Sequence, residues 1–261
     1  MGITSYAPPE FSMRFLPIWR RNFLVWKKLA VASVLGNIAD PLITLVAFGY
    51  GLGSLLKSID GIPYIYYLAS GSICMSIMMA ASFETLYSAF SRMHVQRTWD
   101  ALLNAPLTLD DVIVAEMLWA ATKSLISGIA ILAVMFALGI GLHPHTLAVL
   151  PLLFVIGMTF ASLGLVVNAL AKGYDFFTYY FTLVLTPMIF LSGVYYPTAQ
   201  LPGWLQAISR LLPLSAAVHL VRPLILGAWP VTPMRDFVIL IVYCVGGFYL
   251  ATIMTRRRLL K

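Results

Sequence analysis

The sequence predicts an all-α integral membrane protein whose residues 1–261 form one transmembrane domain. Hydrophobic residues make up 61% of the 261-residue chain and charged residues only 10%, whereas a soluble domain has about 25% charged residues. So few polar side chains could not cover a water-soluble particle of this size. Long uncharged runs, separated by polar or proline-rich stretches, predict six transmembrane helices. The other expected elements are an interfacial amphipathic helix near the N-terminus, a short cytosolic docking helix, and short re-entrant helices before the last span.

A basic amphipathic helix is predicted at residues 11–29. Three cationic residues recur there at intervals of seven, and three aromatic residues occupy the other side. These residues are Arg14, Arg21 and Lys28, and Trp19, Phe23 and Trp26. The pattern is typical of a helix that lies in the membrane interface with its Trp rings at headgroup level. The alternative is a cytosolic helix packed on a partner.

Six spans follow from the lengths of the apolar runs. They are predicted at residues 37–56, 64–90, 112–142, 146–170, 176–194 and 237–254. The first is expected to begin at Asn37 or Asp40, because Pro41 suits the first turn of a helix. Residues 195–233 are apolar but are interrupted by six prolines. Such runs are too short to cross a bilayer and predict outer re-entrant helices that dip into the outer leaflet.

Residues 92–116 form a long polar island in the interior of the chain. Thr98 could cap a short helix that Pro106 ends, and Thr108 could cap the next helix, which has acidic residues in its first turn. The apolar face of the short helix consists of Trp99, Leu102 and Leu103. An exposed apolar face on a polar segment predicts a docking helix at residues 97–107 that another protein pushes on. The alternative is an ordinary solvated loop between two spans.

The cationic residues predict the orientation of the chain. With an inner N-terminus and six spans, thirteen of the 17 Lys and Arg residues fall on the inner side and four on the outer side. The outer residues are Lys57, Arg210, Arg222 and Arg235. Membrane proteins retain positive charge on the cytoplasmic side. We therefore expect a multi-pass protein with both termini in the cytosol.

Missing motifs exclude several function classes. No Gly-Lys dipeptide occurs, so the chain has no Walker A loop for ATP, and HExxH, CxxC and GxSxG are also absent. Cys74 and Cys244 lie in apolar runs, as packed core residues do. His143 and His145 resemble a metal-binding pair, but no third ligand type lies near them. Basic patches with interleaved aromatic residues occur only beside the spans, so nucleic acid is not an expected partner. We expect no catalytic residue and no bound metal in this chain.

Five stretches, spread over nearly the whole chain, resemble one protein family. They are LGNIADP (35–41), ASFETLYSAF (81–90), QRTWDALLNAPLT (96–108), TPMIFLSGVYYP (186–197) and LPLSAAVHLVRPLILG (212–227). The last two resemble the type-2 ABC permeases, the ABC-2 transporters. The first and third are similar to the NodJ-like branch of that family, which exports nodulation-factor lipo-oligosaccharides.

The resemblance implies the permease subunit of an exporter. Two copies of this chain would pair with two copies of a NodI-like ATPase, which would bind ATP and Mg, so this chain itself would need no cofactor. Residues 97–107 would be the coupling helix, and its contact residues with the ATPase would be Arg97, Trp99, Asp100, Leu102 and Leu103. The cargo would be a lipid-linked saccharide leaving the bacterial inner membrane. Alternatives are ABC-2 export of another glycolipid, a polysaccharide or a hydrophobic drug, a secondary transporter, and a membrane enzyme that acts on lipid-linked sugars.

Charged and aromatic residues inside the spans are candidates for the substrate pathway. Glu84 lies near the cytosolic end of the second span, where it could pair with Lys123 of the third span or contact substrate. Aromatic rings stack on sugar faces, although most aromatic residues of a membrane protein serve packing or interface belts. The candidate pathway residues are Asp40, Glu84, Tyr87, Tyr195 and Tyr196.

Overall fold

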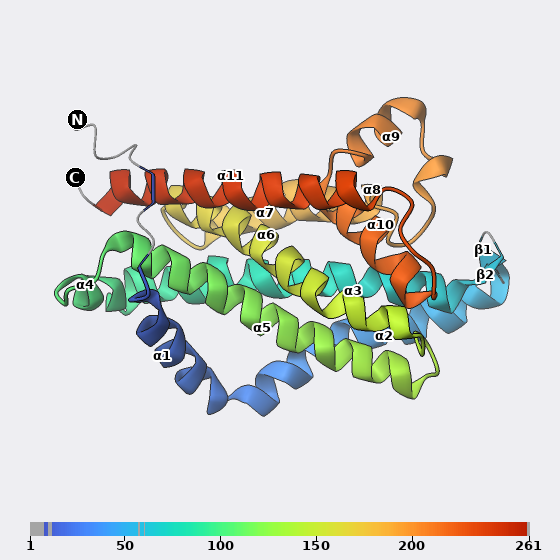
Figure 1. Cartoon of the computed structure of the whole chain (residues 1–261), viewed down its shortest axis with the longest axis horizontal. Coiled ribbons are helices and arrows are strands. Elements are labelled where there is room, and N and C mark those ends of the chain that lie inside the picture. The colour runs from blue at the N-terminus through green and yellow to red at the C-terminus, as the bar shows by residue number, and fades with distance from the viewer. Residues whose placement is uncertain (1–7, 10–11, 57, 60, 260–261) are drawn as a thin grey trace.

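Apolar helices dominate the chain and pack side by side along one axis (Figure 1). The computed structural model describes residues 8–9, 12–56, 58–59 and 61–259, without the side chains of residues 37, 38, 40 and 41. The elements up to the third long helix are α1 (Phe15–Lys27), α2 (Ala30–Leu56), β1 (Ser58–Ile59), β2 (Ile62–Pro63), α3 (Tyr64–Phe83), η2 (Glu84–Ser88), η3 (Ser91–Val95), α4 (Thr98–Leu103) and α5 (Leu109–Ala137). Then follow η4 (Pro144–Ala148), α6 (Val149–Leu170), α7 (Asp175–Tyr180), η5 (Phe181–Leu185), α8 (Thr186–Leu191), η6 (Thr198–Gln200), α9 (Gly203–Ser209), α10 (Pro213–Ile225) and α11 (Pro233–Leu259).

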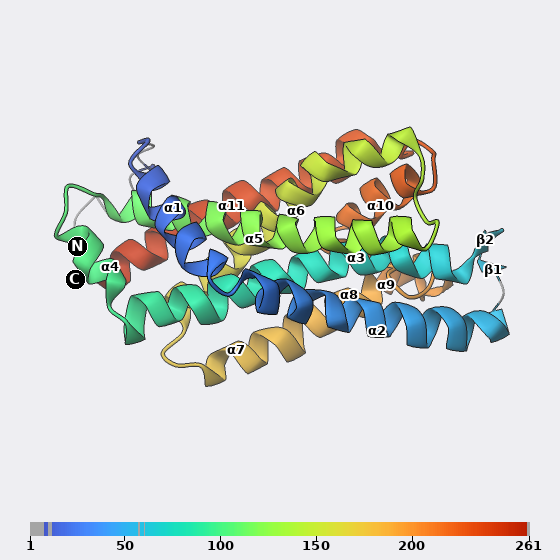
Figure 2. The ribbon, with the colours of Figure 1, turned by 90° about the horizontal axis from the view of Figure 1, so that it is seen from below.

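The two ends of the bundle carry different parts of the chain. The start of α1, the helix α4 and the end of α11 share one end, whereas the β1–β2 hairpin lies at the other (Figures 1 and 2). The hairpin is antiparallel and pairs Ser58 with Pro63 and Ile59 with Ile62. The polar island of residues 92–116 therefore lies on the same side of the bundle as the basic last turn of α11.

Among the described residues, four helices are long and apolar enough to cross a membrane. They are Tyr64–Val95, Leu109–Ala137, Pro144–Leu170 and Pro233–Leu259. The pair of α9 and α10, which is bent by 81°, makes a fifth if its two arms are one broken span. Leu42–Leu56 and Asp175–Leu191 are apolar but shorter. The prediction of an all-α membrane protein is confirmed, whereas the predicted six spans exceed the four or five that length and composition support.

The aromatic side of α1 faces the bundle. Trp19 Nε1 donates to Thr122 Oγ1 of α5 at 3.1 Å, and the rings of Phe23 and Trp26 meet the ring of Trp119 edge-on. The exposed large apolar residues of α1 are instead Leu16, Leu24 and Val25. The aromatic residues of α1 that suggested a headgroup-level belt therefore stabilise contacts within the chain.

The proline-rich segment also packs against its own chain. α10 contacts α3, α6 and α11, and most of its side chains are buried. Arg222 of α10 donates from Nε to Ser70 Oγ at 3.0 Å and from its terminal nitrogen to the Gly193 carbonyl at 2.7 Å. The guanidinium also lies 3.6 Å from the centre of the Tyr67 ring. Arg222 thus satisfies a backbone carbonyl at the end of α8, where Gly193 has a φ of 73° and the helical hydrogen bonds stop.

Small residues allow α6 and α11 to approach closely, as is typical of membrane helices. A Cβ atom added at Gly247 would lie 2.6 Å from Ser162 Oγ, whereas one added at Gly246 would meet no heavy atom within 4 Å. We therefore expect Gly247→Ala to lower the free energy of unfolding by about 1–3 kcal/mol. The neighbouring Gly246→Ala should leave it unchanged or raise it by up to about 1 kcal/mol.

Unfolding of the two purified glycine variants in mixed micelles, titrated with sodium dodecyl sulfate, measures this difference. Both variants add one methyl group to the same helix, so Gly246→Ala controls for helix propensity. Equal destabilisation by the two variants would contradict the close approach of α6 and α11.

Candidate functional site

Four charged side chains meet beside α4 and form what we call the charge cluster: Glu84, Arg92, Glu116 and Lys123. The Arg92 guanidinium donates to Glu84 Oε1 at 2.8 Å and to both oxygens of Glu116 at 2.9 and 2.5 Å. Lys123 Nζ donates to Glu84 Oε2 at 2.7 Å. The interpretation of Glu84 as a partner of Lys123 is confirmed. The cluster joins η2 and η3 of one long helix to α5.

Two indole N–H groups complete the hydrogen bonding of the carboxylates. Trp119 Nε1 donates to Glu84 Oε1 at 2.8 Å, and Trp99 Nε1 donates to Glu116 Oε1 at 3.3 Å. Glu84 is 3% exposed and Glu116 is 1% exposed. Removing such a carboxylate from water costs several kcal/mol unless it is paired and hydrogen-bonded. The burial of the two carboxylates is therefore stable only while all of their partners are present. Through Trp99, the charge cluster also attaches α4 to α5.

Wide helical turns bring Glu84 and Arg92 to the same side of their helix. Positions eight residues apart on a regular α-helix point about 80° away from each other. Both η2 and η3 are π-helical, and a π-helical turn accommodates an extra residue. Asn168 of α6 supports the first of these turns, since its Nδ2 donates to the Thr85 carbonyl at 2.6 Å. The irregular turns thus give both side chains access to α5.

The apolar side of α4 faces the bundle, so the prediction that this side is exposed was wrong. Trp99 is 1% exposed, and Leu102 and Leu103 pack against the hydrophobic core. The physical reason is that the nearest apolar surface for this short helix belongs to its own chain. The exposed residues, which we call the polar face of α4, are Arg97, Asp100, Ala101 and Asn104. A coupling role of residues 97–107 stays a prediction, but the polar face is what α4 presents outward.

The two predicted helix caps have different outcomes. Thr98 does not cap α4; its Oγ1 donates to the Arg92 carbonyl at 2.9 Å, and the N-cap position is occupied by Arg97 in the left-handed region with a φ of 51°. A positive φ is uncommon for a residue with a Cβ atom, and here it turns the chain from η3 into α4. Thr108 caps α5 as predicted, because its Oγ1 accepts from Asp111 N at 3.2 Å and Asp111 Oδ2 accepts from Thr108 N at 2.9 Å.

Further bonds connect the start of α5 to the ends of α6 and α11. The Arg256 guanidinium bonds both carboxylate oxygens of Asp110, with Nε donating to Oδ1 at 2.9 Å. Arg258 donates to the carbonyls of Asn168 and Ala169, both at 3.0 Å. Basic side chains at such positions satisfy the free carbonyls of a helix C-terminus. The charge cluster is therefore part of a larger connected unit at the α4 end of the bundle.

The candidate pathway residues do not converge on one place. The Tyr195 carbonyl accepts from the hydroxyl of Tyr64 at 3.3 Å, at the start of α3. Glu84 comes directly after that 20-residue helix. At 1.5 Å per residue, it lies about 30 Å from the start of the helix along the axis. Tyr196 is half-buried and lies beside Tyr195 in the chain. Glu84 and the Tyr195–Tyr196 pair thus belong to opposite ends of the bundle.

Tyr87 lies on the same side of the bundle as Glu84, among other rings. It stacks on Phe83, with ring centres 5.4 Å apart, and on Tyr174, with ring centres 5.9 Å apart. Asp40 belongs to α2, and its side chain lies outside the described residues. A role in the substrate pathway stays a prediction for all five candidates.

The cysteine and histidine residues give no metal site in the described part of the chain. No group of three or more His, Cys, Asp or Glu side chains is placed to hold a metal ion there. Cys74 and Cys244 are both free and buried, in agreement with the interpretation that they are packed core residues.

A cavity of about 320 Å³ opens beside the charge cluster. It lies between α1, the η2–η3 part of the long helix and α5, and its polar lining includes Arg21, Asn22, Glu84, Arg92 and Lys123. Arg21, Arg92 and Lys123 are positively charged and carry only hydrogen-bond donors, whereas Glu84 is the one negatively charged residue among these five. Donors therefore outnumber acceptors among them. The cavity is therefore suited to an acceptor-rich, anionic group.

The sequence analysis did not select Arg92, Glu116 and Trp119 as site residues. A usable signal was the symmetry of the polar island, since Arg92 and Glu116 lie at equal distances in sequence from Asn104. When two helices run antiparallel, positions equidistant from the turn between them lie side by side. Trp119 carried no such signal, because an aromatic residue in a span is usually a packing residue.

The comparison with known proteins agrees with this architecture. The ABC-2 type transporter family matches residues 13–226. Nodulation protein J of Rhizobium leguminosarum bv. viciae is 46% identical over 264 residues, which cover 100% of each chain. Nodulation protein J of Rhizobium meliloti (strain 1021) is 44% identical, with 97% of each chain covered. The inner membrane transport permease YadH of Escherichia coli (strain K12) is 27% identical over 89% of this chain and 90% of its own. The resemblance to NodJ proteins is thereby confirmed, and the chain belongs to the ABC-2 type transporter family.

Proposed function

We propose that this chain is the permease subunit of an ABC exporter in the bacterial inner membrane. The cargo is a lipid-linked saccharide, most simply a nodulation-factor-like lipo-oligosaccharide, and a separate NodI-like subunit hydrolyses the ATP. Membership of the ABC-2 type transporter family supports the transport role, and the similarity to Nodulation protein J supports the cargo class. The assembly contains two copies of this chain and two ATPases.

The observation that carries this proposal is the connection of α4 to the bundle through the charge cluster. Trp99 of α4 bonds Glu116, Glu116 bonds Arg92, and Arg92 bonds Glu84. A displacement of α4 is therefore transmitted to α5 and to the η2–η3 region together. Closure of the ATPases against α4 would rock these helices and open a path for an amphiphile, whose acyl tail stays in lipid while its polar head is shielded.

The ATPase contact can be tested on the polar face of α4. We expect Asp100→Lys to reduce the recovery of the ATPase with the tagged permease about tenfold, because reversing a charge at an interface places like charges together. Asp100 is exposed and its side chain makes no hydrogen bond or ion pair with a described residue, so the free energy of unfolding should stay within about 0.5 kcal/mol of the native value. ATP-driven transport of an acylated chitooligosaccharide into proteoliposomes should fall in parallel.

Asp175→Lys serves as the matched control, since Asp175 is another exposed aspartate, at the start of α7. If Asp100→Lys recovers as much ATPase as Asp175→Lys and transports normally, α4 is not the docking element. If no ATPase is recovered with the native chain from cells that produce the exporter, the proposed function itself fails.

The proposed topology has six crossings, with Leu42–Leu56 of α2 and the α7–α8 segment as the two short ones. We expect a single cysteine at Ser58 or at Thr198 to react with a membrane-impermeant maleimide in intact cells. A cysteine at Gln96 or Gly173 should react only after the membrane is opened. The background variant has Cys74 and Cys244 replaced by alanine. Labelling of Gln96→Cys in intact cells would overturn the cytosolic placement of α4.

A further inference from the structure

The cavity beside the charge cluster contains a positive charge that the cluster does not neutralise. The four charges of the cluster cancel, since Arg92 and Lys123 pair with the two glutamates. Arg21 of α1 adds a fifth charge, and no described carboxylate lies within the 4.0 Å of an ion pair with it. Its guanidinium donates at 2.9 Å to Asn22 Oδ1, a neutral acceptor. The lining of the cavity is therefore cationic overall.

Asn22 contributes a second, independent feature. Its side chain lines the cavity and is only 4% exposed, yet its Nδ2 donor has no hydrogen-bond partner among the described residues. A buried donor without a partner costs about 1–3 kcal/mol. An acceptor that enters from the cavity and contacts Nδ2 would recover this energy. The Arg21 guanidinium is hydrogen-bonded to the Asn22 side chain and both line the cavity, so one ligand oxygen group can meet both.

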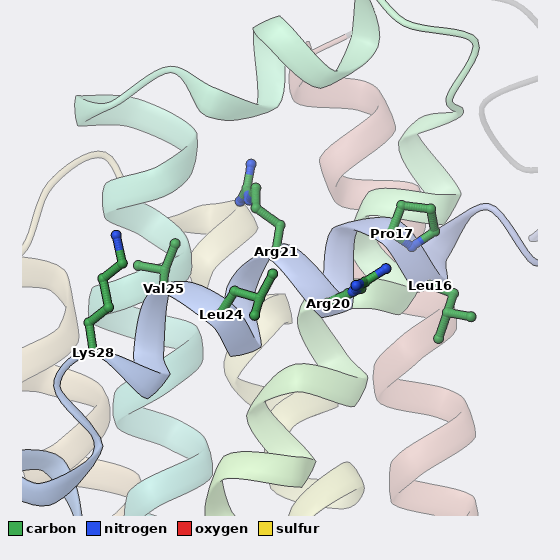
Figure 3. Close-up of a pocket in the computed structure, with 7 residues that line it drawn as sticks. All are labelled: Leu16, Pro17, Arg20, Arg21, Leu24, Val25 and Lys28. Atoms are coloured by element: carbon green, nitrogen blue, oxygen red, sulfur yellow. The ribbon is translucent and has the colours of Figure 1, made fainter.

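An apolar groove on α1 continues from the cavity (Figure 3). Arg21 and Val25 line both the cavity and the groove, and the groove also includes Leu16 and Leu24, which are 52% and 50% exposed. Figure 3 shows Arg20 and Arg21 leaving the helix in different directions, and only Arg21 reaches the cavity. A molecule with a polar anionic end and an apolar body would fit both parts. In a membrane protein that description matches a lipid.

We propose that this cavity binds the phosphodiester headgroup of an anionic inner-leaflet phospholipid, with an acyl chain along the groove of α1. Phosphodiester oxygens only accept hydrogen bonds, and they carry the charge that balances Arg21. The cavity volume of about 320 Å³ equals that of about ten water molecules, enough for a phosphate group and its hydration. The pKa of Arg21 is lowered, mainly because burial disfavours the charged guanidinium; nearby Glu116 raises this pKa and Arg92 lowers it. A bound anion would act in the same direction as Glu116 and favour the charged guanidinium.

Inner-leaflet placement rests on the proposed cytosolic position of α4, which the cysteine labelling tests separately. Headgroup binding is tested with the full chain, delipidated in neutral detergent and titrated with dioleoyl phosphatidylglycerol or dioleoyl phosphatidylcholine. Native mass spectrometry counts the bound lipids. We expect one phosphatidylglycerol to bind in preference to phosphatidylcholine. Arg21→Gln should weaken that binding about tenfold, because one charge-assisted hydrogen bond is lost.

Asn22→Asp should weaken phosphatidylglycerol binding at least as much, since it replaces a donor by a negative charge. Lys27→Gln is the matched control: it removes the same charge from the same helix, Lys27 lines neither the cavity nor the groove, and the affinity of this variant should stay within about twofold of the native value. Glycerol phosphate, which has the anion without acyl chains, should compete only weakly. If Asn22→Asp does not fold, the comparison of Arg21→Gln with Lys27→Gln still decides.

Three outcomes would overturn the proposal. Equal losses in Lys27→Gln and Arg21→Gln would indicate general attraction to a basic helix. Equal affinity for the two lipids would remove the requirement for an anion. Full competition by glycerol phosphate would identify a site for a soluble anion and not for a lipid.

Discussion

Replacing Arg92 by methionine is expected to destabilise the folded chain by about 3–5 kcal/mol, because it leaves two buried carboxylates without their shared partner. Glu84 would keep Lys123 and Trp119, whereas Glu116 would keep only the Trp99 indole among the cluster bonds. Methionine fills much of the same volume as arginine, so the loss of stability comes more from the missing positive charge than from lost packing. Titration of unfolding in mixed micelles measures the change, and ATP-driven transport should fall to background.

Two variants define the specificity of this result. Arg97→Met removes an exposed arginine only five residues away and should change the free energy of unfolding by less than about 0.5 kcal/mol. Arg92→Met combined with Glu116→Gln should recover part of the lost stability, because the second change removes one unpaired charge. Native stability in Arg92→Met would show that the charge cluster does not hold the bundle to α4.

Replacing Trp99 by alanine is expected to cost about 3–5 kcal/mol, the usual range for a fully buried tryptophan. Trp99 is 1% exposed and donates to Glu116, so the variant loses both packing and a hydrogen bond. We expect less folded permease in the membrane, and ATPase recovery should fall only in proportion to the folded amount. This pattern differs from that of Asp100→Lys, where recovery falls while the permease stays folded.

Trp99→Phe separates the two losses. It retains an aromatic ring in the core but has no N–H to donate to Glu116, so we expect a destabilisation of about 1–2 kcal/mol. The measurement is again the free energy of unfolding, compared with quantitative ATPase recovery from the same preparations. A fully stable Trp99→Ala that nevertheless fails to recover the ATPase would restore the interpretation from the sequence, in which Trp99 itself contacts the ATPase.

The lipid headgroup site and the coupling function make different demands on α1 and α4. The headgroup cavity uses Arg21 and Asn22 of α1, whereas the proposed ATPase contact uses the polar face of α4. Both adjoin the charge cluster, since Glu84, Arg92 and Lys123 line the cavity while Glu116 bonds Trp99. Because the two sites use different residues, a variant can lose lipid binding and still recover the ATPase. The two proposals can therefore fail separately.

Much of the architecture follows from properties that are local in the sequence. The low charge content makes a soluble fold impossible, and apolar runs of the required length become long helices because their backbone bonds must be satisfied internally. The cap of α5 was also predictable, since Thr108 and Asp111 are three residues apart and meet in any helix that starts there. The family resemblance was visible for the same reason, because its motifs are contiguous stretches.

The assignment of faces was decided by tertiary structure. The spacing of Trp99, Leu102 and Leu103 showed that α4 has an apolar side, but the direction of that side depends on where α5 lies. The same holds for α1, whose aromatic residues pack on α5 and leave leucine and valine exposed. An amphipathic pattern defines two sides of a helix, and only the neighbouring elements determine which side is covered.

The ionic contacts show where sequence reasoning ends. Glu84 and Lys123 could be paired from their depths on neighbouring spans, because depth follows from the helical rise. Arg92 could not be placed between two carboxylates, since its direction depends on the π-helical turns η2 and η3. The pairing of Arg256 with Asp110 joins residues 146 positions apart and required the end of α11 to lie beside the start of α5. By itself the sequence determined the membrane fold, the family and the cap of α5; helix rotation and packing, which depend on distant residues, determined the charge cluster and the cavity beside it.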